Sequence, residues 1–322
     1  IVRKYVDPDG AMVQSNRYKQ YVDAPSIGDK VISILKNHDG KKPIFLWAHF
    51  MDTHLPYVSG KGKRWWRETK HYLAATGHDP SISPAISFRR SLPRDKGEWE
   101  KLSALYDASV RGVDEQIGRI FDALVSLGIE NNTIIVFCGD HGEELGEHGN
   151  RSHHFLPYEH NISIPMLYNA PKHAGAEIKG LTSLLDVAPT ISALAGLPPD
   201  PGWEGLPVTH EDINKRGHVL VEFFYGGNCL FKNRPIYAGV RTHRHKYFWK
   251  EFRDPRDWQS RNGHELYDLF HDREEQHNVY NVDHPALPEL ELCIARRLAE
   301  LPEISQERIV RAFGKSVAAK VT

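Results

Sequence analysis

Apolar positions along the chain follow two patterns, and each predicts a different kind of element. Spacings of three and four residues, which are typical of amphipathic helices, recur in segments 27–36, 102–127, 181–194 and 287–301. Short continuous apolar runs, which are typical of strands covered on both faces, occupy 44–48, 133–138 and 162–168. Helices and strands alternate, so the order predicts an α/β fold with a mostly parallel sheet flanked by helices.

The pattern changes twice along the chain. Residues 55–99 keep no period and are rich in Gly, Pro and basic residues, which predicts a long loop. Residues 198–214 turn to Pro, Gly and charge, and beyond them three segments with alternating or aromatic positions read as antiparallel strands: 219–224, 236–241 and 246–252. We therefore expect an α/β portion over 1–205 and a small antiparallel α+β domain over 206–322.

Composition narrows the class of protein. The 322 residues carry 41 Lys and Arg against 42 Asp and Glu, which speaks against a nucleic-acid-binding protein. The apolar runs are far shorter than the roughly 20 residues of a membrane-spanning helix, so no span is expected. The 19 histidines, several of them beside acidic residues, are typical of metal or proton-transfer sites.

The first candidate site follows the run 133–138 directly. Asp140 and His141 stand between glycines at the carboxyl end of this predicted strand, where α/β sheets bind ligands. Carboxylate oxygens suit a hard divalent cation, and the glycines let the backbone bring both side chains to one point. The alternative is a glycine-rich turn whose acidic side chains are only solvated.

Histidines form two further candidates. His49, Asp52 and His54 emerge from the run 44–48, so an imidazole there could donate a proton to a substrate oxygen, or serve the structure alone. His153 and His154 lie in a polar loop, where such a pair is more often solvated than functional.

Together these segments resemble the sulfatase family of the alkaline phosphatase superfamily. The similarity runs in family order from about Asp29 to Leu301. The motifs that carry it are His49-x-x-Asp52-x-His54-x-Pro56-Tyr57, Asp140-His141-Gly142-Glu143, Gly146-x-His148-Gly149, Tyr158-Glu159, Asp186-x-x-Pro189-Thr190 and Glu265-Leu266-Tyr267-Asp268-Leu269.

The resemblance implies an alkaline phosphatase-like fold and hydrolysis of a small-molecule or glycan sulfate ester with release of sulfate. It implies that Asp140 and His141 ligate one divalent cation, usually Ca²⁺. His54 matches a histidine that contacts the sulfate or helps to protonate the leaving oxygen, and His154 matches a Lys or His on the sulfate ester. The nucleophile of the family is a hydrated formylglycine made from Cys or Ser.

Two family features are missing from the sequence. No Cys or Ser begins the family motif x-Pro-x-Arg at its usual place, and no Asp-Asp dipeptide supplies the remaining metal ligands. We expect both, with the first strands of the α/β domain, upstream of Ile1. The alternatives are a degenerate, non-catalytic anion-binding relative, and a phosphodiesterase or phosphonate monoester hydrolase with a similar site. The compartment and the oligomeric state stay open.

Overall fold

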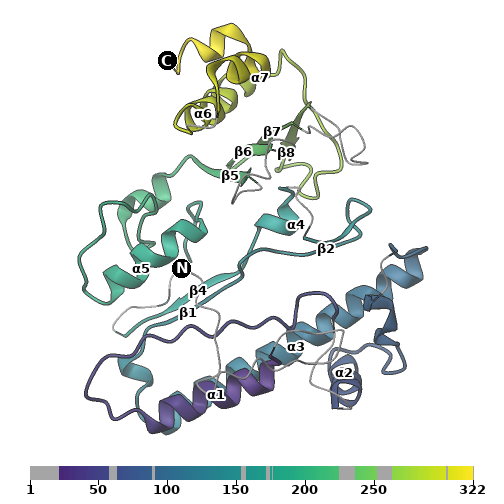
Figure 1. The fold of residues 1–322 in the computed structure, drawn as a ribbon, viewed down its shortest axis with the longest axis vertical. Helices are drawn as coiled ribbons and strands as arrows, with labels where there is room; N and C mark the ends of the chain where they lie inside the picture. Colours follow the sequence, from purple (N-terminus) through teal and green to yellow (C-terminus); the bar gives the residue numbers. More distant parts are fainter. Residues whose placement is uncertain are drawn as a thin grey trace. The chain divides into compact units, whose positions relative to one another are not determined.

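A computed structural model (Figure 1) describes residues 22–57, 64–88, 91–153, 157–171, 175, 177–224, 236–251, 263–301 and 304–321. Internal contacts divide the chain into two units. The first consists of residues 1–133 and 149–152, and the second of 134–148 and 153–322. Each unit is described by itself. No helix among the described residues is both long enough and apolar enough to cross a membrane.

The first unit is built on one long helix. Its elements are α1 (Ala24–Asn37), α2 (Arg64–Ala75), α3 (Lys96–Ser126), the 3₁₀ helices Pro84–Phe88 and Glu130–Asn132, and the short strand β3 (Arg151–Ser152). Asp95 caps α3 by accepting a hydrogen bond from Glu98 N at 2.9 Å. Both α1 and α2 pack on α3, which buries Leu102 and Leu105 completely. The helices predicted over 27–36 and 102–127 are confirmed.

Two predictions for this unit are wrong. Residues 44–48 form no strand, and Phe45 and Trp47 are 74% and 71% exposed, because no described segment hydrogen-bonds to them or covers them. The predicted loop over 55–99 contains α2 and a 3₁₀ helix. The helix was missed because the charged residues of its sequence, RWWRETKHYLAA, stand among the apolar ones and obscure the period.

The second unit begins with two short strands and a turn of helix. Its first elements are β1 (Ile135–Cys138), β2 (Glu144–Leu145), α4 (Glu159–Ile162), β4 (Met166–Asn169), the 3₁₀ helix Leu184–Asp186 and α5 (Val187–Leu194). Strands β1 and β4 pair antiparallel, with Ile135 opposite Asn169, so the parallel direction expected for this segment is wrong. Parallel neighbours are usually joined by a helical crossover, whereas the described part of the connection from 139 to 165 has the four-residue α4 as its helical element.

Asp186 ties the segment around α5 together. Its carboxylate is fully buried and accepts two hydrogen bonds from the Arg216 guanidinium at 2.6 and 2.8 Å. The backbone N–H groups of Ser183 and Leu206 donate to the same carboxylate, each at 2.8 Å. The Asp186 carboxylate of this motif therefore links the start of α5 to Leu206 and Arg216.

A four-stranded sheet forms the rest of the unit. Strands β5 (His218–Phe224), β6 (Ile236–Thr242), β7 (His245–Glu251) and β8 (Gly263–Asp268) pair antiparallel in the order β5-β6-β7-β8. Helices α6 (Leu287–Ala299) and α7 (Gln306–Ala318) follow. The three predicted strands and the helix over 287–301 are present, whereas β8 and α7 were not predicted as elements.

The two faces of this sheet differ in chemistry because side chains alternate along each strand. Val240, Tyr247 and Leu266 belong to one apolar cluster with residues of α6 and α7. The alternate positions of the same strands carry charged side chains among aromatic ones: Arg241, Lys246, Phe248, Lys250, Glu265 and Tyr267. One face is thus an ordinary hydrophobic core, and the other supplies buried charges.

The predicted mixture of helices and sheet is confirmed. All strand pairs described within each unit are antiparallel. A mostly parallel sheet for the whole α/β domain, and the boundary at residue 205, stay predictions.

Candidate functional site

The loop after β1 lies directly against α4. Gly142 N donates a hydrogen bond to Asn161 O at 2.8 Å. A Cβ atom on Gly142 would stand only 1.9 Å from His160 O, so no other residue fits here without moving one of the two segments. The contact fixes where the loop places the side chains on either side of Gly142.

Replacing Gly142 by alanine is expected to displace the loop and to destabilise the protein by at least about 1–3 kcal/mol, the usual cost of overpacking. Gly139 is the matched control, because a Cβ there meets Ile164 at an ordinary 3.4 Å. Thermal unfolding of the Gly142→Ala and Gly139→Ala variants measures the difference. Equal stability of the two would contradict this account of the contact.

Asp140 and His141 lie side by side in this loop. Asp140 Oδ1 accepts a hydrogen bond from His141 N at 3.0 Å, and Asp140 Oδ2 is 3.9 Å from His141 Nε2. His141 Nδ1 lies 2.8 Å from Gly142 O. A carbonyl oxygen can only accept, so Nδ1 carries a proton, and in the neutral ring the lone pair is on Nε2. Metal-binding histidines usually have this arrangement.

The separation of these two side chains fits a shared divalent cation. Two ligands that each bind an ion at about 2.4 Å can stand up to about 4.8 Å apart, and the Asp140 and His141 atoms are 3.9 Å apart. Asp140 is 64% exposed, so its carboxylate can accept a ligand without unfolding the loop. Two side chains do not fill a coordination sphere, and the remaining ligands would come from elsewhere.

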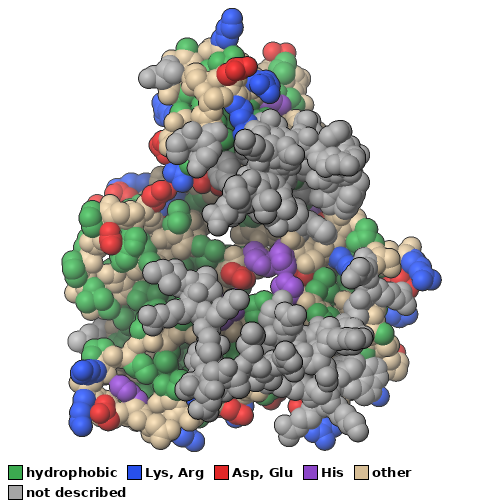
Figure 2. Space-filling model, viewed as in Figure 1, with side chains coloured by type: hydrophobic (Ala, Val, Ile, Leu, Met, Phe, Trp, Pro, Cys, Tyr) green, Lys and Arg blue, Asp and Glu red, His purple; other side chains and the backbone are tan. Residues whose placement is uncertain are grey.

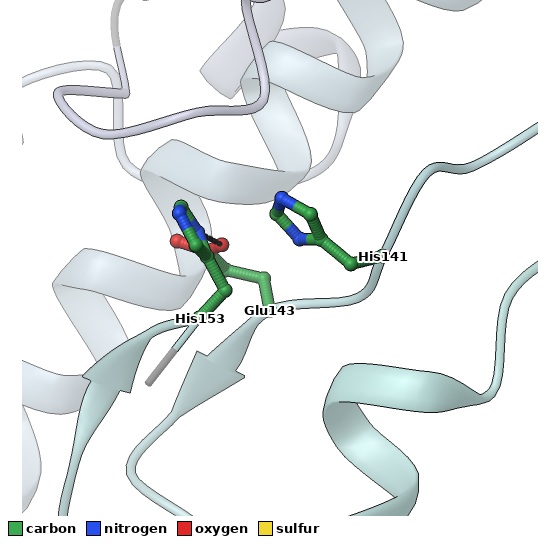
Figure 3. Close-up of side chains that lie close together, drawn as sticks. All are labelled: His141, Glu143 and His153. Atoms are coloured by element: carbon green, nitrogen blue, oxygen red, sulfur yellow. Dashed lines mark hydrogen bonds and ion pairs between the residues drawn. The ribbon is translucent and has the colours of Figure 1, made fainter. Parts of the chain in front are cut away.

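Three side chains in the second unit converge on one point (Figure 3). His141, Glu143 and His153 each offer a ligand atom, and the three atoms lie within 4.8 Å of one another. His153 Nδ1 is 3.2 Å from Glu143 Oε2, and the two imidazole centroids are 4.1 Å apart. The Glu143 side chain is only 4% exposed, against 34% for His153. We call this set the His-Glu-His cluster.

Buried charges attach α4 to the charged face of the sheet. Glu159 Oε1 is 3.2 Å from Lys246 Nζ, and Glu159 Oε2 is 3.4 Å from Arg241. Lys246 also pairs with Glu275, which accepts a hydrogen bond from Glu159 N at 2.6 Å. The side chains of Lys246 and Glu275 are 1% and 0% exposed. The network therefore joins α4, β6, β7 and the segment after β8.

The electrostatics of this network follow from burial. Desolvation raises the pKa of Glu275 and lowers that of Lys246, since it disfavours the charged form of each group. Burial alone would also raise the pKa of Glu159, but Lys246 and Arg241 together lower it. Glu159 is therefore the charged centre of the network.

A second group of contacts surrounds the same segment. Tyr158 donates to Glu265 at 3.1 Å, and Lys250 pairs with the same carboxylate. His148, which follows β2 in the loop after β1, stacks on the Tyr158 ring with centroids 3.7 Å apart and planes 7° from parallel. Burial lowers the pKa of His148. Tyr158 thus contacts both His148 of the loop after β1 and the buried Glu265 carboxylate of β8.

Of the other predicted site residues, the structure describes His54 and leaves His154 undescribed. His54 belongs to the first unit, where its Nδ1 is 2.6 Å from Leu55 O and Asp52 beside it is buried. His154 lies outside the described residues. Figure 2 shows histidine side chains gathered beside acidic ones on the face it draws.

Sequence reasoning brought together Asp140 and His141 but missed two members of the His-Glu-His cluster. Glu143 was read as part of a motif, and His153 only as half of a solvated pair. The sequence feature that could have indicated the cluster was the excess of histidines near the loop after β1. Lys246 and Glu275 gave no signal, because their roles depend on contacts far along the chain.

Comparisons with known proteins agree with these motifs. A family model described as Sulfatase matches residues 4–197, and one described as N-sulphoglucosamine sulphohydrolase, C-terminal, matches residues 146–303. The endo-4-O-sulfatase of Bacteroides thetaiotaomicron is 33% identical over 173 residues, which are 52% of this chain and 32% of that protein. The chain spans about a third of the length of the curated relatives matched at this identity.

Two solved structures share the fold. The phosphonate monoester hydrolase of Agrobacterium radiobacter superposes with a TM-score of 0.61 at 20% identity, over 89% of this chain and 61% of that one. A protein solved in complex with its substrate D-glucosamine-2-N,6-O-disulfate gives a TM-score of 0.56 at 20% identity, over 92% and 72%. At these identities the likeness concerns the fold, which is alkaline phosphatase-like.

Proposed function

Since the chain belongs to the sulfatase family, we propose that the whole protein hydrolyses sulfate esters and releases inorganic sulfate. The observation that supports the proposal is the loop after β1, where Asp140 Oδ2 lies 3.9 Å from His141 Nε2, a separation that would suit a shared cation. The substrate class that we infer is a small-molecule or glycan sulfate ester, in line with the sulfated sugar bound by one structural relative. No nucleic-acid partner is proposed.

One divalent cation, Ca²⁺ in our proposal, would be held by Asp140 and His141 together with ligands outside the described residues. When bound, it supplies positive charge against the sulfuryl oxygens. Asp140 is exposed and available to the ion, while the Gly142 carbonyl keeps the His141 ring in its orientation. The family's formylglycine would serve as the nucleophile.

The assignment of the two catalytic histidines is also part of the proposal. His54, whose Nδ1 lies 2.6 Å from Leu55 O, would protonate the departing alcohol oxygen when its ring carries both protons. His154 would hold the sulfate group from the loop beside His153. Both contact substrate in this scheme.

Replacing His54 by alanine is expected to lower kcat about 10²-fold or more with a smaller change in KM, since a leaving-group proton is needed only in the transition state. Steady-state kinetics with two sulfate esters test this: the loss should be larger for the more basic alcohol, which needs the proton more. His78→Ala is the control, because His78 pairs with Asp107 at an exposed site of the same unit. Equal losses with both esters would contradict the role of His54.

A second activity is favoured by the phosphonate monoester hydrolase that shares the fold. Assays of the whole protein on a sulfate ester, a phosphate diester and a phosphonate monoester separate the candidates. Higher kcat/KM on the sulfate ester supports our proposal, and a preference for either phosphorus substrate overturns it. Absence of turnover on all three would instead support a non-catalytic anion-binding relative.

The domain organisation is proposed in the same terms. Residues 1–205 would form the later part of an α/β catalytic domain with a mostly parallel sheet, and residues 206–322 the small C-terminal domain. Limited proteolysis of the whole protein, with cleavage expected in 198–214, tests the boundary.

A further inference from the structure

The His-Glu-His cluster has a donor set that differs from that of a calcium site. It offers two imidazole nitrogens for one carboxylate, whereas Ca²⁺ in proteins favours a set of six to eight ligands dominated by oxygen, in which His141 of the proposed Ca²⁺ site would be a minority donor. Imidazole with carboxylate is the set preferred by Zn²⁺ and neighbouring transition metals. All three donors belong to the second unit and lie within 13 residues of sequence, so this chain supplies them without further segments.

From this geometry we infer that His141, Glu143 and His153 form a binding site for a transition-metal cation of the Zn²⁺ type, distinct in composition from the site of the proposed Ca²⁺. The three ligand atoms lie within 4.8 Å of one another, and the ligand atoms of tetrahedral zinc stand about 3.4 Å apart. Side-chain rotations that move these atoms by about 1 Å would therefore complete the site. His141 and His153 are 40% and 34% exposed, which leaves them room to rotate.

The surroundings of the cluster favour metal binding. Glu143 is almost fully buried and so keeps a fixed position, with His153 Nδ1 beside its Oε2. Gly142 O holds the ring of His141 with Nε2 as its lone-pair atom. A metal ion bound by the cluster gains three ligands. Two of them, the Glu143 carboxylate and the His141 imidazole, are already oriented.

The site has a consequence for activity that rests on the proposed function. His141 belongs both to the Asp140 pair and to the cluster, and one imidazole lone pair binds one ion. A transition metal held with Glu143 and His153 therefore removes His141 from Asp140. We expect Zn²⁺ to inhibit the hydrolase by this competition.

Cobalt is the probe for the site, because tetrahedral Co²⁺ with imidazole ligands absorbs visible light whereas Zn²⁺ does not. The chain is titrated with CoCl₂, and ZnCl₂ is then added to displace it. Glu143→Gln and His153→Ala are each expected to weaken Co²⁺ binding at least about tenfold. His210→Ala is the matched control, since His210 has only Asp212 as an acidic neighbour at 3.6 Å, and it should bind Co²⁺ like the parent chain.

Circular dichroism of each variant shows whether it is folded, so that a loss of Co²⁺ binding is not confused with a loss of structure. If Glu143→Gln fails to fold, His153→Gln is a milder second variant. Equal Co²⁺ affinity in the parent and all cluster variants, or displacement of Co²⁺ by Ca²⁺ as readily as by Zn²⁺, would overturn the inference. In the whole protein, Glu143→Gln should raise the Zn²⁺ concentration for half inhibition about tenfold. Co²⁺ binding without any sulfatase activity would refute the proposed function and leave the metal site standing.

Discussion

The Asp140→Ala variant of the whole protein is expected to lose its bound Ca²⁺ and to turn over sulfate esters about 10³-fold to 10⁴-fold more slowly, because a metal ion contributes several kcal/mol of charge stabilisation. The fold should survive this change. Asp140 is 64% exposed, and the hydrogen bond that its carboxylate accepts from His141 N is local and solvated.

The measurement pairs metal analysis with kinetics on the same preparation. Calcium content per chain and kcat/KM are determined for Asp140→Ala and for Asp200→Ala. Asp200 is the matched control, an exposed aspartate that accepts a hydrogen bond from Gly202 N two residues on, at 2.8 Å. An Asp140→Ala protein with full calcium and full turnover would show that the loop after β1 is only a solvated glycine-rich turn.

The Lys246→Met variant is expected to lose about 3–5 kcal/mol of unfolding free energy, the usual effect of removing one partner from a buried ion pair. Lys246 is 1% exposed and pairs with Glu159 and Glu275, so its loss leaves two carboxylates facing each other out of water. Lys215→Met is the control. Lys215 pairs with Asp212 at 2.8 Å but is 68% exposed, and such a pair contributes at most about 1 kcal/mol.

Acid should partly rescue Lys246→Met. Burial raises the pKa of Glu275, and Lys246 opposes this shift, so removing the ammonium raises that pKa further. A carboxyl whose folded-state pKa lies above its unfolded value stabilises the fold below the unfolded pKa and loses this contribution as pH rises through the folded pKa. Urea unfolding from pH 5 to pH 8 should therefore show a deficit that grows with pH. A loss of unfolding free energy that stays the same from pH 5 to pH 8 would contradict the explanation by unpaired buried carboxylates.

How far the sequence predicted the fold depended on whether a pattern was local. The helical stripe of α3 is visible within a few turns, so α1 and α6 were predicted to within three residues at each end, and α3 apart from its first six residues. The direction of β1 was not, because a continuous apolar run looks the same in a parallel and an antiparallel pair. Segment 44–48 was read as buried from its residues alone, although burial also needs a neighbour that covers it.

The same distinction between local patterns and distant contacts holds for the candidate site. Asp140 and His141 are adjacent in sequence and follow a strand, so their position could be predicted. The closeness of His153 to Glu143, ten residues away, depends on how the loop folds back. The contacts of Glu159 with Arg241, Lys246 and Glu275 join residues 82, 87 and 116 positions apart, and no local pattern encodes them.

The shortness of α4 has a consequence for how this region moves. A helix of four residues is far below the length that is stable by itself, so α4 keeps its shape only while Glu159 is held by the sheet. The loop carrying Asp140 and His141 rests on α4 through Gly142. Loop, helix and sheet should therefore open together as one cooperative folding unit, with amide exchange around Gly142 as slow as that of β7.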